Sequence, residues 1–410
     1  MKLWRSGIIW SVLSFIGGLG NYLFSALIGH RLTTEEFGFT NSMLDFITFL
    51  GLPLQMVSTA LVHYIAYFRG KNDDARLRGL LAGCQKFLLK ATVAGSILAI
   101  VLADPLGRFF HFQRGSMMLA VSICVLVGLW SGFAVALCQG MAWFKRLAVI
   151  GLAAVGLRLL FGWFVLRKTD PAEIAVSATT VSLFANLVLL YWWKDIFQRD
   201  AEKISPWNRE FVSFLVITVA TVGGSYFFTT GDGLVAKRYF TGGENGAYQA
   251  AARLGRAIPQ TVGPLLLVMF TSRSGSKEGA AISDQRILLV LYALGLACGA
   301  AGLVLFRGLF VKFILKPYNP AAAAMVIPYS ITMVLIGLNQ AIGMWSLANR
   351  WFKMASVYGT LGLIYWLTLL YAGKTPAALL HTMPIAAAVA FCVLCASWLL
   401  ALRREPAPAG

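Results

Sequence analysis

The sequence predicts an all-α polytopic membrane protein with about 12 transmembrane helices in two six-helix lobes related by pseudo-twofold symmetry. Three observations carry this prediction. First, 58% of the 410 residues are hydrophobic and only 13% are charged, whereas soluble domains carry roughly 25% charged residues. Second, apolar stretches of about 20 residues recur along the chain, each long enough to cross a hydrocarbon layer of roughly 30 Å. Third, the two halves share landmarks at one fixed spacing.

Two motifs mark the internal repeat. The segment from Gly29 to Gly38 contains an arginine, a short polar turn and then Glu-x-Gly opening an apolar helix, and the segment from Lys237 to Gly246 repeats this design. The tripeptide Trp143-Phe-Lys145 recurs as Trp351-Phe-Lys353, and both pairs of motifs are offset by 208 residues. Because a tripeptide with tryptophan rarely recurs by chance at the same register, we interpret the chain as two related halves.

Apolar runs of spanning length follow one another along the whole chain. The run from Gly7 to Gly29 is too long for a signal-peptide core and predicts an uncleaved first span. The hydrophilic connector at 194–210 divides six spans from six and predicts lobes at 1–203 and 204–402, with a cytoplasmic tail at 403–410. The predicted spans are residues 7–29, 40–67, 79–103, 116–140, 145–166, 174–193, 210–236, 246–270, 286–306, 321–347, 354–372 and 380–402.

The distribution of lysine and arginine predicts the orientation. With a cytoplasmic N-terminus, 19 basic residues fall in inside segments and 11 in outside segments, so the positive-inside rule places both termini in the cytoplasm. Both Glu-x-Gly turns then lie outside and both Trp-Phe-Lys turns inside, which makes the halves parallel repeats about an axis along the membrane normal. The excess of 35 basic over 17 acidic residues is spread over short loops, which indicates topology rather than nucleic-acid binding.

Several charged residues fall inside the predicted spans, where each costs roughly 2.5–3.5 kcal/mol or more at mid-membrane. They should therefore face a water-filled cavity or one another. For Lys90 and Arg158 the cavity position and its alternative both stay open, whereas Lys86 can extend toward the cytoplasmic interface. Asp232 can cap a helix break or join the cavity. These residues are Asp45, Lys86, Lys90, Arg158, Asp232, Arg253 and Arg256.

The second and eighth spans carry matched polar stripes. On each, four positions follow at steps of 4, 3 and 4 residues, which places them on one helix face. The offset of 208 maps one set onto the other, so the stripes should face each other across the central axis. A structural Asp45–Arg253 pair is one interpretation, but it leaves Arg256 uncompensated, which favours an anion site. The positions are Asn41, Asp45, Thr48 and Leu52, extended by Gln55 and Thr59, and Gln249, Arg253, Arg256 and Gln260.

Motifs for catalysis or cofactors are not evident in the sequence. It holds no Gly-x4-Gly-Lys-Ser/Thr phosphate loop and no His-Glu-x-x-His zinc motif. The six cysteines lie in apolar segments, which is typical of small core residues rather than a metal or redox site. We therefore predict a protein that is not an enzyme and that carries no cofactor and no metal.

The chain resembles the multidrug/oligosaccharidyl-lipid/polysaccharide (MOP) exporter superfamily, and within it the Wzx-type polysaccharide flippases. The resemblance covers the whole chain and is carried by the twelve spans in two repeats, by Arg31-Leu-Thr-Thr-Glu-Glu-Phe-Gly38 and by Glu244-Asn-Gly-Ala-Tyr248. It implies two lobes around a central cavity that opens alternately to the two sides of the bacterial inner membrane. It also implies a cationic cavity, a general role that we extend to Arg253, Arg256 and Asp45. The lipid II flippases of the superfamily carry two further helices that this chain lacks.

The resemblance further implies that the cargo is a polyprenyl-pyrophosphate-linked oligosaccharide of the undecaprenyl type, moved in membrane lipid beside a polysaccharide polymerase or export machinery. Such a headgroup is anionic and hydrated, and arginine can bind phosphate in a bidentate manner. Without a nucleotide motif, an ion or voltage gradient must supply the energy. The candidate substrate-binding residues are Arg253, Arg256, Asp45, Gln249, Gln260, Asn41, Thr48, Gln55, Lys90, Arg158 and Asp232.

Two other functions compete with a flippase at this point. A cation-coupled multidrug exporter of the same fold favours an acidic, apolar cavity, and the two arginines on one stripe argue against it. A membrane-bound glycan-assembly enzyme or a scaffold without transport activity is the second alternative. The missing catalytic constellation argues against the enzyme.

Overall fold

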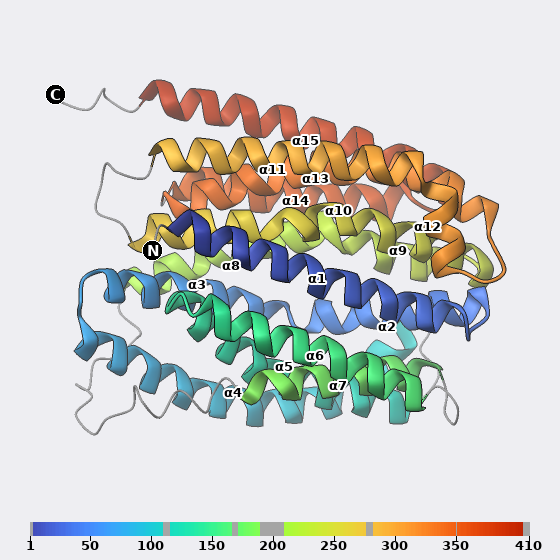
Figure 1. Ribbon diagram of the computed structural model, residues 1–410, viewed down its shortest axis with the longest axis horizontal. Coiled ribbons are helices and arrows are strands. Elements are labelled where there is room, and N and C mark those ends of the chain that lie inside the picture. Colours follow the sequence, from blue (N-terminus) through green and yellow to red (C-terminus); the bar gives the residue numbers. More distant parts are fainter. Residues whose placement is uncertain are drawn as a thin grey trace.

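The computed structural model describes residues 3–109, 115–165, 171–188, 209–275, 282–349 and 351–404, and within these ranges all regular structure is helical (Figure 1). Most of the helices are long and run roughly along one direction. They are α1 (Leu3–Gly29), α2 (Thr34–Leu50), α3 (Leu52–Gly70), α4 (Asp74–Phe109), α5 (Gly115–Gly140), α6 (Phe144–Val165), α7 (Pro171–Leu187), α8 (Arg209–Thr229), α9 (Gly231–Tyr239), α10 (Gly242–Gly275), α11 (Ile282–Leu305), α12 (Arg307–Ile314), α13 (Pro320–Ala348), α14 (Phe352–Ala372) and α15 (Pro376–Arg404).

When α2 is joined with α3 and α8 with α9, and the short helix α12 is left out, these helices correspond to the twelve predicted spans. Within the described ranges, seven helices are long and apolar enough to cross a membrane, and the bent α2–α3 pair makes an eighth. The all-α, polytopic fold class is therefore confirmed. Helix α1 begins and α15 ends at the same end of the molecule (Figure 1), as an even number of passes requires.

Two of the predicted spans, 40–67 and 210–236, are broken helices. Helix α2 ends at Leu50 and meets α3 at an angle of 52°. Pro53 in the first turn of α3 lacks the N–H that would continue α2, so the helix restarts there. Helix α8 ends at Thr229, and α9 begins at Gly231. The short helix α12 was not predicted at all.

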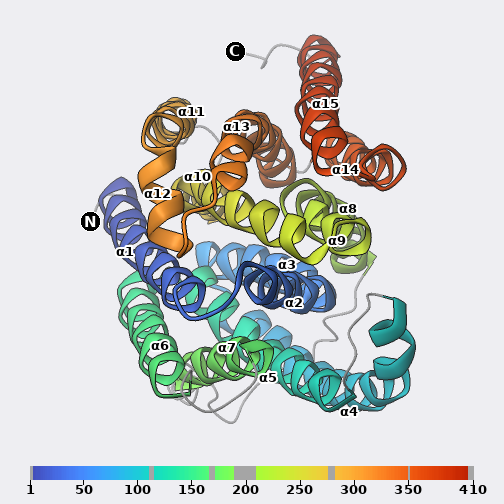
Figure 2. The same cartoon turned by 90° about the vertical axis from the view of Figure 1, so that its right-hand side faces the viewer.

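Helices α2 and α3 lie at the centre of the molecule, between α4–α7 on one side and α8–α15 on the other (Figure 2). Helix α2 packs on α10, α3 packs on α8, and α1 packs on both α6 and α10. The central contacts therefore join helices from both sequence repeats. The predicted lobe boundary at 203/204 lies outside the described residues, as does the predicted tail from residue 405 onward.

The two Glu-x-Gly motifs are helix starts with the same local chemistry. Thr33 caps α2 in a capping box, because its backbone N–H donates to Glu36 at 2.8 Å and its hydroxyl accepts from the backbone of Glu36. Thr241, just before α10, donates to Glu244 from its backbone N–H at 3.0 Å and from its hydroxyl at 2.8 Å. The repeated motif thus starts a helix in each half, because its threonine and glutamate hydrogen-bond to each other where the first N–H groups of a helix lack partners within the helix.

The glycine of each motif brings the two helix starts into direct contact. A Cβ atom on Gly38 would lie 2.6 Å from the backbone nitrogen of Gly246, and one on Gly246 would lie 2.0 Å from the carbonyl oxygen of Thr34. Only glycine allows this approach, because any side chain would overlap backbone. We call residues 33–38 and 241–246 the paired turns. They join α2 and α10 at one end of the molecule.

Candidate functional site

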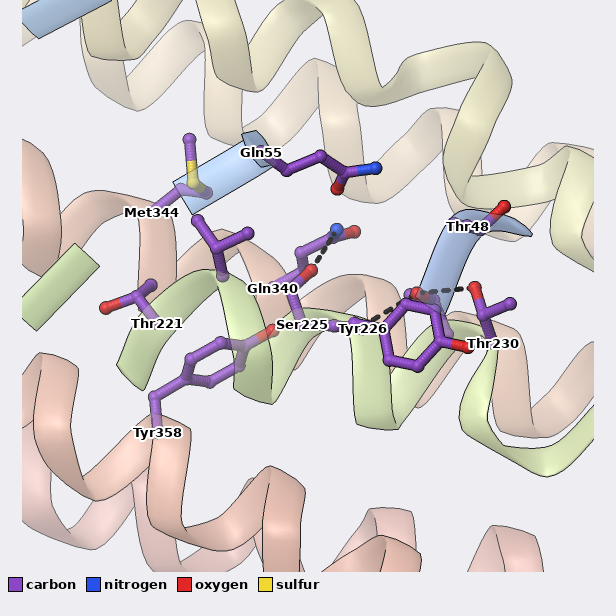
Figure 3. A pocket seen from close by; sticks show the side chains of 11 residues that line it. Thr48, Gln55, Thr221, Ser225, Tyr226, Thr230, Gln340, Met344 and Tyr358 are labelled. Carbon is purple, nitrogen blue, oxygen red and sulfur yellow. Dashed lines mark hydrogen bonds between the residues drawn. The ribbon is translucent and has the colours of Figure 1, made fainter. Parts of the chain in front are cut away.

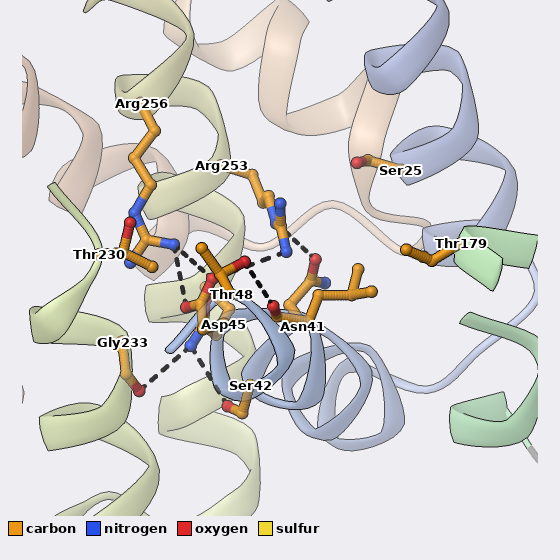
Figure 4. Close-up of polar contacts among 12 residues, drawn as sticks. Ser25, Asn41, Ser42, Asp45, Thr48, Thr179, Thr230, Gly233, Arg253 and Arg256 are labelled. Carbon is orange, nitrogen blue, oxygen red and sulfur yellow. Dashed lines mark hydrogen bonds and ion pairs between the residues drawn. The ribbon is translucent and has the colours of Figure 1, made fainter. Parts of the chain in front are cut away.

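A buried charge network lies one to three helical turns beyond the paired turns, centred on Arg256 of α10 (Figure 4). The Nη1 atom of Arg256 donates to both carboxylate oxygens of Asp45 on α2, at 2.8 and 2.9 Å. Its Nη2 atom donates to Asp232 at 3.0 Å, and its Nε atom donates to the hydroxyl of Tyr329 at 3.1 Å. The side chains of all three charged residues are at most 5% exposed. Arg256 is therefore compensated by two carboxylates.

Asp232 reaches the network because the chain breaks between α8 and α9. It is the second residue of α9, where the helix N-terminus favours a negative charge. Besides Arg256, it accepts hydrogen bonds of 2.6 Å from the hydroxyls of Tyr248 and Tyr329. Gly233 leaves the space for this arrangement, since a Cβ there would lie 2.0 Å from the Asp45 carboxylate. The sequence left two interpretations of Asp232, a cap at a helix break or a residue of the cavity. Asp232 does follow a helix break, but its side chain turns inward to the charge network.

The expectation that an Asp45–Arg253 pair leaves Arg256 uncompensated was wrong, because Arg256 makes the close contacts with Asp45 and Asp232 while Arg253 makes only a long one with Asp45. Arg253 donates from Nε to the side-chain oxygen Oδ1 of Asn41 at 2.6 Å, and its Nη2 atom lies 3.8 Å from an Asp45 carboxylate oxygen. Arg256 takes the close contact because α9 inserts Asp232 beside it. A guanidinium with five N–H donors can then satisfy two carboxylates at once. The register of the repeat gave no sign of this third helix.

A polar cavity of about 200 Å³ opens beside Arg253, and we call it the arginine cavity. Arg158 enters it from α6, donating to Asn21 at 3.0 Å and to Thr179 at 3.2 Å. Its guanidinium also lies 4.3 Å from the ring centre of Phe24. The cavity is lined by Gly18, Asn21, Tyr22, Phe24, Ser25, Ile28, Asn41, Leu44, Arg158, Arg253, Arg256 and Gln260.

The arginine cavity carries unsatisfied donors and a surplus of positive charge. The Nε atom of Arg158 and the Nη2 atom of Arg253 are buried and make no hydrogen bond within the described part of the chain. Together with Arg256, these arginines make three positive charges against the two carboxylates of Asp45 and Asp232, which leaves one positive charge in excess. Buried donors without partners are uncommon and costly. The arrangement therefore suits an anion with several acceptor oxygens.

A second cavity of about 180 Å³ borders the charge network, where Tyr226 donates to the backbone oxygen of Asp45, and we call it the neutral cavity (Figure 3). Thr48 and Gln55 enter it from α2 and α3, and the remaining side chains come from α8, α13, α14 and the α8–α9 break. No charged residue is among those that line it in the described ranges. They are Thr48, Gln55, Thr221, Val222, Ser225, Tyr226, Thr229, Thr230, Gln340, Met344 and Tyr358.

The predicted stripe residues are distributed over three places. Asn41 and Gln260 line the arginine cavity with Arg158, whereas Thr48 and Gln55 line the neutral cavity. Asn41 and Thr48 both lie on α2 before the bend at Gly51 but line different cavities, so the second span does not present one continuous stripe. Gln249 is fully buried, and its amide nitrogen lies 3.2 Å from the Ser42 hydroxyl and 3.4 Å from the Gly233 carbonyl oxygen. Lys90 is exposed on α4 and lines neither cavity.

Sequence reasoning missed several cavity residues. Asn21 of α1 and Gln340 of α13 are amides within long apolar runs, and that isolation was a usable signal. Ser225 and Tyr358 gave no comparable signal, because hydroxyl side chains are common in membrane helices. No group of three or more His, Cys, Asp or Glu residues that could hold a metal ion occurs in the described ranges.

The architecture is that of MATE transporters. An inward-facing multidrug resistance MATE family transporter of the MOP superfamily superposes with a TM-score of 0.69 and 13% identity, over 98% of this chain and 100% of that chain. A MATE in the straight conformation gives 0.69 and 14%, over 99% and 98%. A MOP superfamily transporter from Pyrococcus furiosus, described as having a binding pocket of reverse polarity, gives 0.67 and 13%, over 99% and 98%.

No family model and no curated protein matches the chain in sequence. At these low identities the likeness is one of fold, and it establishes a multi-pass membrane protein built like a MATE transporter. What a protein of this fold binds depends on the residues that line its cavities.

Proposed function

We propose that this protein is a flippase that moves a polyprenyl-pyrophosphate-linked oligosaccharide across the bacterial inner membrane by alternating access. The observation that carries the proposal is the arginine cavity, where Arg158 and Arg253 present buried N–H groups without hydrogen-bond partners in the described chain. A pyrophosphate offers several charged oxygens to such donors, and hydrogen bonds to charged groups are the stronger kind. Asn21, Ser25 and Gln260 add neutral polar groups for the adjoining part of a headgroup.

Charge balance favours an anionic cargo over a cationic drug. In a drug exporter of the same fold, the acids of the cavity would have to remain available to a cation. Here Asp45 and Asp232 are both bound by Arg256 and are at most 3% exposed. The residue that borders the open space is Arg253, whose side chain is 25% exposed. A cationic drug would therefore meet positive charge first.

Transport requires energy, and the sequence has no nucleotide-binding loop. We propose that a gradient across the membrane drives the cycle, since moving one charge through 100 mV is worth about 2.3 kcal/mol. We further propose that both termini lie in the cytoplasm and that the protein operates beside a polysaccharide polymerase or export machinery. Labelling of single cysteines introduced near residues 4 and 402 in intact cells tests the orientation.

Translocation assays in proteoliposomes test the proposed cargo. The substrate is a lipid-linked oligosaccharide with a fluorescent sugar, and flipping is measured by its protection from an added glycosidase. Arg253→Gln and Arg158→Gln should each lower the initial rate at least about tenfold, the equivalent of 1.4 kcal/mol, because each removes a phosphate contact.

Lys90→Gln is the matched control, because it removes a positive charge that lies outside the cavities and should leave the rate unchanged. Normal rates in both arginine variants would refute the assignment of the site. Export of a cationic dye in place of the lipid-linked sugar would favour the drug exporter. Chemical change of the substrate without translocation would favour the enzyme.

A further inference from the structure

We propose that the neutral cavity is a binding site for an uncharged sugar, separate from the arginine cavity that takes the phosphate. This inference rests on the proposed function and adds a second site for the glycan part of the cargo. Both cavities border the Asp45–Arg256 pair, since Arg256 lines the arginine cavity. Tyr226 of the neutral cavity donates its hydroxyl to the backbone oxygen of Asp45 at 3.2 Å, so the wall between the cavities is thin.

The lining chemistry of the neutral cavity matches a sugar. Hydroxyl and amide groups that both donate and accept are spread around it, and the rings of Tyr226 and Tyr358 with the thioether of Met344 supply apolar surface. Sugars present hydroxyls at their edges and C–H groups on their faces, so they need both kinds of contact. A volume of about 180 Å³ holds about six water molecules, which is the space of one sugar ring.

Several of the lining groups are already held in place. Gln340 donates its amide to Ser225 at 2.8 Å. Thr48, Thr221 and Thr229 donate to carbonyls four residues earlier in their helices. Their hydroxyl oxygens keep lone pairs that can accept from a ligand. The cavity is thus a set of fixed acceptors rather than a flexible surface.

Tyr358 provides an independent sign of a ligand. Its side chain points from α14 toward α8 in Figure 3 and is 1% exposed. Its hydroxyl lies beside Ser225, but it meets no partner with full hydrogen-bond geometry within the described chain. A buried hydroxyl without a partner costs free energy in the empty protein, and a ligand hydroxyl in the cavity would satisfy it.

Charge excludes the other candidate occupants. No acidic side chain lines the cavity to hold a cation, and no basic one lines it to hold a second phosphate, among the residues described. The cavity is also bordered by helices of both repeats, α2 and α3 on one side and α8, α13 and α14 on the other. A sugar bound there would contact both halves of the protein and would be released when they separate.

Binding measurements with two synthetic probes test the inference. The protein is purified in lipid nanodiscs, and the probes are a prenyl pyrophosphate carrying a neutral oligosaccharide and the same prenyl pyrophosphate without sugar. Tyr358→Phe should raise the Kd of the glycosylated probe about three- to tenfold, the loss of one neutral hydrogen bond, and leave the Kd of the bare probe unchanged. Gln340→Leu should do the same through a second contact.

Tyr365→Phe is the matched control. Tyr365 lies on the same helix, is also buried and also has a hydroxyl without a partner in the described chain, but it does not line the cavity. Its variant should bind both probes as the wild type does. Because both tyrosine variants remove only an unsatisfied oxygen, both should fold.

The outcomes separate this inference from the proposed function. If Tyr358→Phe and Gln340→Leu bind the glycosylated probe as tightly as the wild type, the neutral cavity is filled by water only and the inference is overturned. If they weaken only the glycosylated probe while Arg253→Gln weakens both probes, both proposals are supported. If Arg253→Gln changes neither Kd, the phosphate site is refuted, while the result at Tyr358 still decides the sugar site.

Discussion

The paired turns and the charge network belong to the same two helices but differ in their symmetry. In the paired turns, Thr33 and Thr241 make matching contacts with Glu36 and Glu244, and the glycines meet across the repeat. Two turns further along, the repeat mate of Asp45 is Arg253, and the mate of Thr48 is Arg256. Where the halves kept the same residues, the residues start and join helices. Where the halves diverged, they built an ion-pair network and two cavities of different polarity.

The difference shows which interactions a repeat can specify. A capping box acts within one helix turn, so each half can carry its own copy. An ion pair across the repeat axis needs unlike partners, so it requires divergence. The network also recruits Asp232 from α9, outside both stripes. The following predictions test this contrast, from the largest expected effect to the smallest.

Removing Arg256 should destabilise the protein most. Arg256→Ala leaves the buried carboxylates of Asp45 and Asp232 without their cation, and breaking a buried pair in this way costs about 3–5 kcal/mol. The measurement is the thermal unfolding midpoint of the purified protein in detergent. Arg253→Ala should have a clearly smaller effect, because Arg253 is partly exposed and its contact with Asp45 is long. Equal losses in the two variants would show that the network is not centred on Arg256.

Filling the contact between the paired turns should have an intermediate effect. Gly246→Ala places a methyl group against the backbone of Thr34, and such overpacking typically costs about 1–3 kcal/mol. The control is Gly243→Ala in the same helix turn, where a Cβ would meet nothing within 4 Å. We expect that change to stay within about 0.5 kcal/mol. Similar melting temperatures for both variants would contradict the close contact.

Loss of the cap on α2 should be smaller still. Thr33→Ala removes the hydroxyl that accepts from the Glu36 backbone and should cost about 0.5–2 kcal/mol. Thr33→Ser keeps the hydroxyl and should restore most of the stability. Hydrogen exchange of the first turn of α2 measures the local effect. Unchanged protection in the alanine variant would show that the cap contributes nothing.

The smallest effect should be a pH dependence at Glu244. Hydrogen bonds from the hydroxyl and backbone of Thr241 hold the pKa of Glu244 below its ordinary value of 4.5. The resulting stabilisation is complete above pH 4.5 and is lost as the pH falls through the lowered pKa of the folded protein. Glu244→Gln should therefore show a flatter dependence of melting temperature on pH in this acidic range. An identical profile in the variant would locate the titration elsewhere.

The membrane fold could be predicted from the sequence because the length of an apolar run is a local property of the chain. Each apolar run in the membrane must satisfy its backbone hydrogen bonds internally, so it forms a helix regardless of the segments around it. The repeat offset then placed Asn41, Asp45, Arg253 and Arg256 close together, and the structure does bring these four into contact. Local rules and internal symmetry together located the centre of the site.

The breaks in two spans were harder to predict. Gly51 with Pro53 was a visible signal for the bend between α2 and α3. The break before Asp232 depends on what surrounds it. There, Tyr248, Tyr329 and Arg256 offset the cost of turning a carboxylate inward, and all three come from other helices.

By itself the sequence determined that the chain forms membrane-spanning helices, that its halves are repeats and that charges gather on the second and eighth spans. These properties follow from composition and spacing along one chain. Only the tertiary structure decided that Arg256 takes both carboxylates, that Arg158 joins Arg253 in one cavity, and that Thr48 and Gln55 face another. Which partner a charged side chain pairs with depends on the distances between helices. Coulomb energy and the cost of desolvation both change steeply over a few ångströms, so small shifts of a helix decide which charges form a buried ion pair.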